Sequence, residues 1–295
     1  MSKFILSGCS TMDLTEERLK ERDIKYICYH FTMDGEVYPD DLGKTISNEE
    51  FYQKLVDGAD ATTSQVNYDE FVEYFTPFLE QGYDILHVCM SSGITGVFNS
   101  ANIAKNDLLE KYPDRKIILV DSLAASSGYG LLMETLADLR DKGMPMEEIA
   151  YFAESNKLHL HHWFFSTDLT FFVKGGRISK AAGWFGTMLN LCPLLNVSNE
   201  GKLIPRYKVR GKQAVIKKIV EKMEEHAENG HDYDGRCYIC HAACIKDATA
   251  VRDLIEERFP KLKGKVEIYN IGTTIGCHTG PGTVALFFYG DERID

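Results

Sequence analysis

The chain has 295 residues, of which 44% are hydrophobic and 26% are charged, as is usual for a soluble globular protein. This length predicts one large or two ordinary domains. The formal net charge of -11 argues against nucleic acid as the main partner, because phosphate binding favours a basic surface. The sequence contains no apolar run long enough for a membrane span and no signal-peptide core, so we expect a cytoplasmic protein without an integral membrane segment.

Short apolar runs alternate with helical patterns through the first half of the chain. Ser47, followed by Glu50 three positions later, forms a capping-box pattern that predicts a helix start. Strands and helices alternating at this spacing predict a mainly parallel sheet with helices on both faces. We expect strands at 3–9, 24–38 (with a turn at 34–35), 83–90 and 116–122, a hydroxyl-rich loop at 61–65, and helices from residue 13 or 15, from 48, around 71–78, over 102–112 and within 122–143.

The pattern changes near residue 155, where aromatic residues become frequent and strands follow at less regular intervals. The fold class that we predict is therefore α/β with two domains: an N-terminal, mainly parallel α/β domain at 1–160 and a C-terminal mixed α+β domain at 161–295. In the second domain we expect two strands within 194–211 joined by a turn at 199–201, a strand at 237–241, two more strands around a glycine-rich loop within 265–290, and helices at 213–228 and 248–259.

Eight cysteines are present, and without an export signal we expect no disulfides. Residues 237–241 read CYICH, which matches the motif of covalent haem attachment. The same residues are also typical of a buried strand. On a strand Cys237 and Cys240 project to opposite faces and do not bind one metal together. We therefore expect no metal and no haem, and a metal or haem protein built on this pair is the alternative.

Three loops combine small residues with hydroxyl groups or a histidine: TTSQ at 62–65, SSGITG at 91–96 and GCHTGPG at 276–282. Glycines let backbone amides approach a ligand, and hydroxyls donate hydrogen bonds without carrying charge. Together such loops favour an anion site at the ends of strands. The alternative is that each loop is an ordinary tight turn.

A nucleophilic serine is a second interpretation of the same residues. Ser92 and His278 are the two members of a hydrolytic triad that the sequence offers, and an esterase or thioesterase would use them. The G-x-S-x-G motif of many such enzymes is absent around Ser91 and Ser92.

Two further stretches have both a structural and a functional interpretation. An apolar stripe beginning at Ile178 predicts a helix. Gly183 and Gly186 interrupt the stripe and leave room for a narrow apolar channel beside the helix. The alternative is that the helix is part of the hydrophobic core. Arg206, Lys208 and Arg210 alternate along a predicted strand, either as a solvated face or as a contact for phosphate or an acidic partner.

Nine short motifs are spread over the whole chain: STMDL, TTSQ, SSGITGVFNSA, VDSLAASSGYGLL, KGGRISKAAGWFGTMLN, PLL, GKL, KVRGK and HTGPG. Together they resemble the motifs of the DegV family of bacterial fatty-acid-binding proteins. The sequence departs from the family pattern at Cys9, which stands where the family usually has an aspartate.

The resemblance implies a two-domain, non-catalytic protein that holds one long-chain fatty acid in an apolar tunnel between its domains. Thr63, Ser92 and His278 are the implied partners of the carboxylate, with support from Thr62, Ser91, Gly93, Thr279 and Gly280. Relatives present the acid to a separate fatty acid kinase, which makes an acyl phosphate for phospholipid synthesis, so the kinase and an acyltransferase are the implied partners. Arg210 is similar to a family arginine implicated in phosphorylation.

Elementary energetics agree with this resemblance. Burial of each methylene group stabilises a complex by about 0.8 kcal/mol. A buried 16-carbon tail therefore contributes about 12 kcal/mol to the free energy of binding, before the costs of association are subtracted. The carboxylate then needs only satisfied hydrogen bonds, and Ser92 is expected to be a donor rather than a nucleophile. No cofactor besides the bound acid is expected, and the chain lacks a G-x-x-x-x-G-K-[ST] motif with which to hold ATP.

Overall fold

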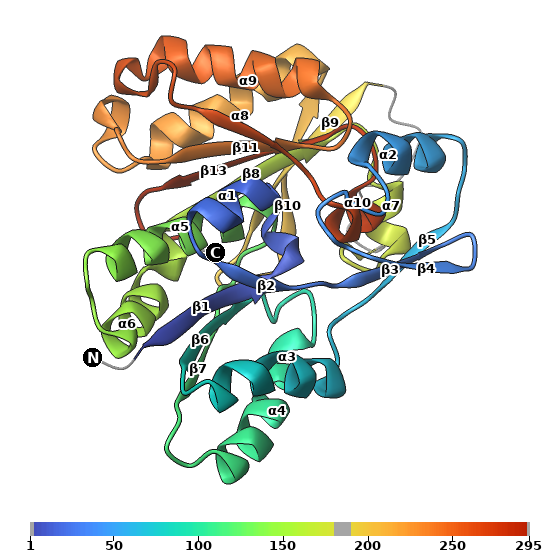
Figure 1. Cartoon of the computed structure of the whole chain (residues 1–295). Coiled ribbons are helices and arrows are strands. Elements are labelled where there is room, and N and C mark those ends of the chain that lie inside the picture. Colours follow the sequence, from blue (N-terminus) through green and yellow to red (C-terminus); the bar gives the residue numbers. More distant parts are fainter. Residues whose placement is uncertain (1–2, 180–189, 294–295) are drawn as a thin grey trace.

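The computed structural model describes residues 3–179 and 190–293 of the chain (Figure 1). The strands are β1 (Phe4–Cys9), β2 (Lys25–Ile27), β3 (His30–Met33), β4 (Glu36–Pro39), β5 (Ala61–Ser64), β6 (Asp84–Cys89), β7 (Ile117–Asp121), β8 (Leu160–Ser166), β9 (Leu191–Val197), β10 (Leu203–Arg210), β11 (Cys237–His241), β12 (Glu267–Asn270) and β13 (Thr283–Tyr289). The helices are α1 (Glu16–Glu21), α2 (Asn48–Val56), α3 (Tyr68–Glu80), α4 (Val97–Lys111), α5 (Ser126–Asp141), α6 (Met146–Asn156), α7 (Thr170–Lys174), α8 (Lys212–His226), α9 (Ile245–Arg258) and α10 (Thr273–Thr279).

Sheet A is the parallel sheet that the first half of the sequence predicts. Its strand order is β2-β1-β6-β7, and every neighbouring pair is parallel. The strand β6 is buried along its whole length, as expected when helices cover both faces of a parallel sheet. The side chain of Ser47 caps α2 as predicted, by accepting a hydrogen bond from the backbone N–H of Glu50.

Sheet B is a small antiparallel sheet in the order β4-β3-β5. Asp34 and Gly35 have positive φ angles and form the predicted turn between β3 and β4. The predicted loop at 61–65 is wrong for its first four residues, because Ala61–Ser64 pair with β3 as strand β5. Threonines are favourable in strands, and here the tertiary pairing decides the structure.

Sheet C has six strands in the order β10-β9-β8-β13-β11-β12, antiparallel except for the β11–β12 pair. Alternate residues enter different apolar clusters: Cys240 faces the cluster shared with sheet A, and Cys237 faces the cluster under α8 and α9. The two cysteines therefore lie on opposite faces, as predicted from strand parity. The fold class is confirmed as mixed α/β with separate parallel and mixed sheets, while the boundary at residue 160, the first residue of β8, stays a prediction.

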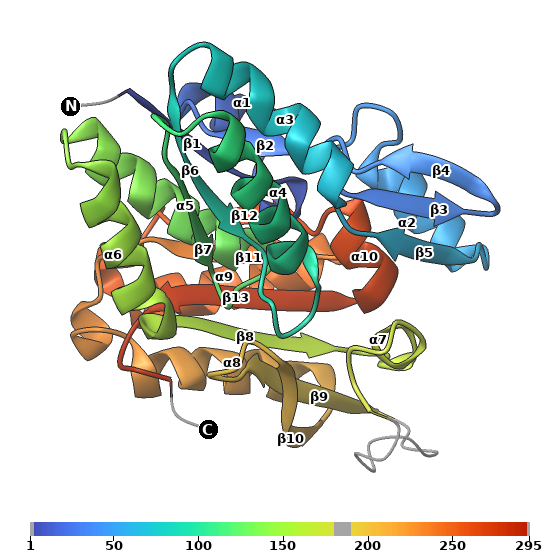
Figure 2. The same cartoon turned by 90° about the horizontal axis from the view of Figure 1, so that it is seen from below.

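The helix α5 lies between the two large sheets. Figure 1 shows the layers in order: α8 and α9, sheet C, α5 with α1, sheet A, and then α3 and α4. Figure 2 shows the same structure from below. Most of α5 from Ser126 to Ala137 is buried. A Cβ atom on Gly128 would stand 2.5 Å from both His162 and Phe287 of sheet C, and one on Gly130 would stand 2.6 Å from the carbonyl oxygen of Met12. Glycine at these two positions therefore allows the helix to contact both neighbours closely.

The glycine-rich segment near the C-terminus differs from the prediction. Thr273–Thr279 form α10, so His278 and Thr279 lie on a helix, and the loop begins at Gly280. Packing against β3 and β5 outweighs the low helix propensity of one internal glycine, Gly276. The predicted helix beginning at Ile178 falls largely on residues 180–189, which lie outside the described residues. None of the described helices is long and apolar enough to cross a membrane.

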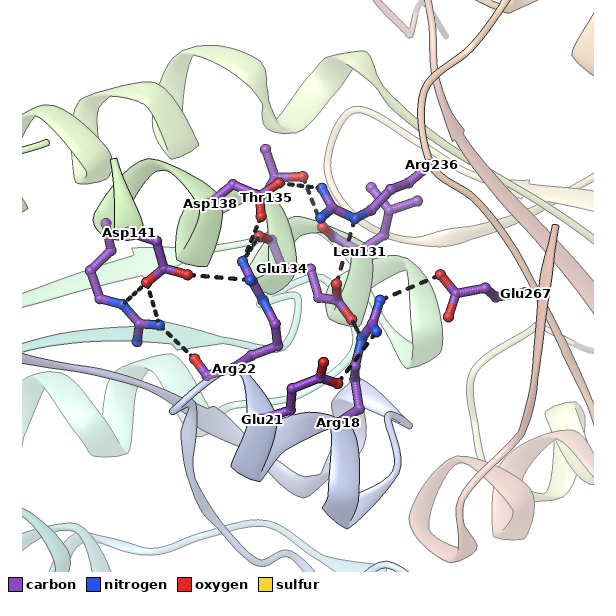
Figure 3. Close-up of polar contacts among 11 residues, drawn as sticks. Arg18, Glu21, Arg22, Leu131, Glu134, Thr135, Asp138, Asp141, Arg236 and Glu267 are labelled. Atoms are coloured by element: carbon purple, nitrogen blue, oxygen red, sulfur yellow. Dashed lines mark hydrogen bonds and ion pairs between the residues drawn. The ribbon is translucent and has the colours of Figure 1, made fainter. Parts of the chain in front are cut away.

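A cluster of charged side chains joins α1 and α5 to sheet C (Figure 3). The side chain of Glu134 on α5 has no solvent exposure and pairs with Arg18 of α1 and with Arg236, whose Nε lies 3.5 Å from Glu134 Oε2. Arg236 also donates to Asp138 at 2.6 Å, and Arg18 reaches Glu267 of β12 at 3.5 Å. The buried carboxylate thus carries two cationic partners from different parts of the chain.

Substitution of Glu134 should destabilise the fold strongly, because it leaves two arginines facing a buried position without their shared carboxylate. We expect Glu134→Gln to lower the free energy of unfolding by about 3 kcal/mol, measured by urea denaturation. The control Glu267→Gln removes a contact whose carboxylate is 41% exposed and should cost about 1 kcal/mol or less. Equal effects of the two variants would show that burial of Glu134 carries no special weight.

Candidate functional site

A cavity of about 1160 Å³ lies between the two halves of the chain. Its walls come from β5, the loop after β6, the start of α5, α7 with the residues after it, α10, and strands of sheet C. The apolar part of the wall includes Met90, Phe164, Phe172, Ile178, Val197, Leu203, Ile271, Ile275, Ala285 and Phe287. Because several of these side chains also belong to the main core cluster, the cavity is continuous with the hydrophobic core.

Thr63 and His278 meet in this wall although they are far apart in the sequence. Thr63 Oγ1 and His278 Nε2 share a hydrogen bond of 2.7 Å. The strand β5 positions the threonine, and α10, which packs against β5, positions the histidine. Gly175 lies against the imidazole, where a Cβ atom would stand 2.2 Å from Nδ1. A histidine proton on Nε2 donates to Thr63 Oγ1 and leaves the threonine hydroxyl hydrogen for a ligand.

Arg177 completes this group, and the sequence analysis did not select it. Its guanidinium donates to the carbonyl oxygens of Gly175 at 2.6 Å and Ile94 at 3.2 Å. Within the described ranges Arg177 has no carboxylate partner, so its positive charge at the cavity wall is uncompensated. We call Thr63, Arg177 and His278 the polar cluster.

The histidine of the polar cluster is held in its neutral form. Burial, and secondarily the positive charge of Arg177, lower the pKa of His278 from the ordinary 6.5 to about 4. Its Nδ1 atom is buried and has no hydrogen-bond partner among the residues that the structure describes. Burial also lowers the pKa of Arg177. The cluster therefore offers neutral donors and one desolvated cation, which suits an anionic ligand group.

The predicted loop at 91–96 contributes its later residues to the cavity. Gly93 and Thr95 line it, and the Thr95 hydroxyl donates to Gln65 Oε1 at 2.9 Å. Ser91 is buried and donates to the carbonyl oxygen of Gly201 at 2.8 Å, which joins this loop to the turn between β9 and β10. Ser92 is exposed and is not among the lining residues; its backbone N–H donates to Asp121 at 3.1 Å.

The structure thus brings together part of the predicted site. Thr62, Thr63, Gly93, His278 and Thr279 line the cavity, whereas Ser91, Ser92, Gly280 and Arg210 do not. Arg210 is exposed at the end of β10. Gly280 faces Phe171 of α7, where a Cβ atom would stand at 2.2 Å. Cys9 is buried in the core, where its Sγ lies 3.7 Å from His87 Nε2 and burial raises its pKa.

The basic stripe of the second domain is interrupted in the structure. The pairing of β10 with β9 shifts register between Pro205 and Tyr207, so Arg206 stands at a bulge. Arg206 Nε donates to Asn196 at 2.7 Å. The simple alternation of basic residues expected on this strand therefore holds only for Lys208 and Arg210.

Comparison with known proteins shows which family has this sequence and fold. The model of the DegV family, described as uncharacterised proteins, matches residues 10–291. The chain belongs to the DegV family. A DegV domain-containing protein of Clostridium perfringens is 36% identical over 99% of both chains. A fatty-acid-binding DegV protein from Thermus thermophilus has a TM-score of 0.85 at 25% identity, covering 98% of this chain and 99% of that one. A DegV lipid-binding protein from Thermotoga maritima has a TM-score of 0.84 at 25% identity, covering 99% of this chain and all of that one.

In this DegV chain the serine and histidine of the hydrolase interpretation are not paired. His278 Nε2 is engaged by Thr63, and within residues 3–179 and 190–293 no hydrogen bond joins Ser92 to His278. Cys237 and Cys240 likewise do not share a face, and burial raises the pKa of both thiols. The geometry therefore supports neither an esterase built on Ser92 and His278 nor a metal or haem site built on Cys237 and Cys240.

The imidazole of His278 should remain neutral down to about pH 5, since its pKa is about 4. Because this pKa lies below the ordinary 6.5, protonation favours the unfolded chain, and the protein loses stability as the pH falls from about 6.5 toward 4. Arg177→Met should raise the pKa of His278 by removing the neighbouring charge. Nitrogen NMR of the imidazole measures the pKa of His278 in the unaltered protein and in Arg177→Met. Lys174→Met, which removes a more exposed cation, is the control. Titration of His278 near 6.5 in the unaltered protein would contradict this account.

Proposed function

We propose that this protein binds one long-chain fatty acid in the cavity, with the carboxylate at the polar cluster and the hydrocarbon tail among the apolar walls. The observation that carries the proposal is the pairing of apolar walls with a local group of donors. The cavity of about 1160 Å³ has many apolar lining residues, and Thr63, Arg177 and His278 form a group of anion-compatible donors in its wall. Lys174 and Lys202 are further cations among the lining residues. The lipid and fatty-acid binding of the two structural relatives supports the same ligand class.

The chemistry of the polar cluster suits a carboxylate that must later react. Neutral hydrogen bonds from Thr63, supported by His278, satisfy the oxygen atoms without a bidentate ion pair. Arg177 adds an electrostatic contribution, while its own hydrogen bonds go to backbone carbonyl oxygens. Such a site holds the acid mainly through its tail and leaves the carboxyl group available for transfer.

We further propose that the bound acid is presented to a separate fatty acid kinase, as the family resemblance implies, and that this chain is itself non-catalytic. The sequence has no phosphate-binding Walker motif, which agrees with a partner that holds ATP. Exposed Arg210 is the proposed contact for the partner or its phosphate, and an acyltransferase is the proposed consumer of the product. Ser92 remains a proposed carboxylate partner, which requires its exposed side chain to turn toward the cavity.

Native mass spectrometry of the purified protein tests the ligand class directly. We expect an added mass equal to one fatty acid per chain, which denaturation and lipid extraction then release and identify. A protein that stays free of added mass even after incubation with fatty acids would contradict the proposal. Turnover of an acyl ester that is lost in Ser92→Ala would favour the esterase alternative instead.

Thr63→Val should weaken fatty-acid binding by about 10- to 100-fold, because it removes a hydrogen bond to a charged group while keeping the side-chain volume. Displacement of a fluorescent fatty acid measures the dissociation constant. Thr32→Val is the matched control, since Thr32 pairs with Thr62 in the same sheet and does not line the cavity. Unchanged affinity in Thr63→Val, or equal weakening in both variants, would remove Thr63 from the proposed site.

The contribution of Ser92 is tested by Ser92→Ala in the same displacement assay. If the serine turns inward on binding, the variant should weaken binding by about tenfold, as expected for loss of one hydrogen bond to a carboxylate. If the exposed position of Ser92 is also its position in the complex, affinity should be unchanged, and the carboxylate is then held by the polar cluster.

A further inference from the structure

Two histidines and an aspartate meet at one end of the central strands β8 and β13 of sheet C, outside the cavity lining. His161 comes from β8, His226 is the last residue of α8, and Asp291 follows β13 by two positions. None of the three lines the cavity. Among the described residues this is the group of histidine, cysteine and acidic side chains whose ligand atoms could surround one metal ion, with all three atoms within 4.8 Å of one another.

The spacing of the donor atoms fits ligands of one metal. His161 Nε2 lies 3.0 Å from Asp291 Oδ1, and His226 Nδ1 lies 3.2 Å from the same oxygen. Ligands placed about 2.0–2.2 Å from a tetrahedral Zn²⁺ stand roughly 3.3–3.5 Å apart, so small adjustments suffice to admit the ion. We propose that His161, His226 and Asp291 form a binding site for one divalent transition-metal ion of the Zn²⁺ class.

The surroundings hold the three ligands in place. The ring of His161 is stacked between Phe288, at a centroid distance of 5.2 Å, and His226, at 4.9 Å. The backbone N–H of Asp291 donates to the carbonyl oxygen of His226 at 3.0 Å, which fixes the aspartate beside the end of α8. These contacts hold the ligands close together before an ion binds, and the ring of His226 is the group that must move to receive it.

Binding of a metal requires a change of tautomer at His161. Burial lowers the pKa of His161 to about 4, so its imidazole is neutral at physiological pH. Its Nε2 lies 2.9 Å from the carbonyl oxygen of Asp291 and carries the proton in this structure, so the ion must bind the tautomer with the proton on Nδ1. Glu225 lies 4.0 Å from His226 Nε2, where a carboxylate can orient the liganding imidazole from behind. The charge of Arg293, which also lowers the pKa of His161, opposes a cation and makes a moderate affinity the expectation.

The chemistry of the donors selects the ion. Two imidazoles and one carboxylate suit Zn²⁺, Ni²⁺ and Cu²⁺, whereas Mg²⁺ and Ca²⁺ prefer oxygen ligands alone. The two rings are stacked with an interplanar angle of 19°, so the half-exposed ring of His226 must tilt for both nitrogens to face one ion. Solvent supplies the fourth ligand, because Asp291 is 60% exposed. A bound ion would connect β8, α8 and the chain after β13, which is a structural role.

The test is titration of the full chain, purified without a histidine tag, with Zn²⁺ by calorimetry and with Co²⁺ by visible absorption. We expect one ion per chain and a tetrahedral Co²⁺ spectrum without a thiolate charge-transfer band. His226→Ala and Asp291→Asn should weaken binding by about 100-fold, and Glu225→Gln by about tenfold. Both ligand variants alter partly exposed side chains, so circular dichroism should confirm an intact fold.

His231→Ala is the matched control, because His231 is an exposed histidine outside the cluster and should not affect binding. Absence of binding in the unaltered chain, a thiolate band that assigns the ion to cysteines, or affinity that is unchanged in both ligand variants would overturn the proposal. Native mass spectrometry of the same variants should show the same lipid content as the unaltered chain, which keeps this result separate from the proposed fatty-acid function.

Discussion

The close packing of α5 between two sheets is the constraint on which the rest of the structure depends. A helix buried on nearly every side needs small residues where it meets its neighbours, and Gly128 and Gly130 meet sheet C and the segment after β1 respectively. This contact fixes the separation of the sheets. The cavity opens where the helix begins, since Ala125 and Ser126 are part of its wall. The space for a ligand thus results from where the helix stops filling the gap between the sheets.

The two ends of α5 serve different physical purposes. Near its start the helix borders an apolar space, and its later turns carry Glu134 and Asp138 into the charged cluster with Arg18 and Arg236. A doubly paired carboxylate is a directional contact, whereas apolar packing is not. The cluster therefore fixes how α1, α5 and sheet C are aligned, and the packing around it supplies most of the stability.

Much of the fold could be predicted from the sequence, because apolar periodicity reports burial directly. Strands at 3–9 and 116–122 and the cap at Ser47 follow from local patterns. The strand β5 and the helix α10 could not, since threonines and glycines are compatible with several structures and tertiary pairing decides among them. Thr63 and His278 were selected by family motifs, but their mutual contact across 215 positions has no local signal. Arg177 was missed because its importance comes from burial without a carboxylate partner, which no sequence pattern shows.

The continuity of the cavity with the core has a consequence for the lifetime of the protein. Met90, Phe164 and Phe287 line the cavity and also belong to the main core cluster. A ligand that fills the cavity therefore completes the core. Ligand binding to the folded state alone shifts the folding equilibrium in proportion to the logarithm of ligand concentration. On the proposed function, copies synthesised when the ligand is scarce would unfold more often and be degraded sooner. The cellular abundance of the protein would then follow the supply of the proposed ligand without any change in gene expression.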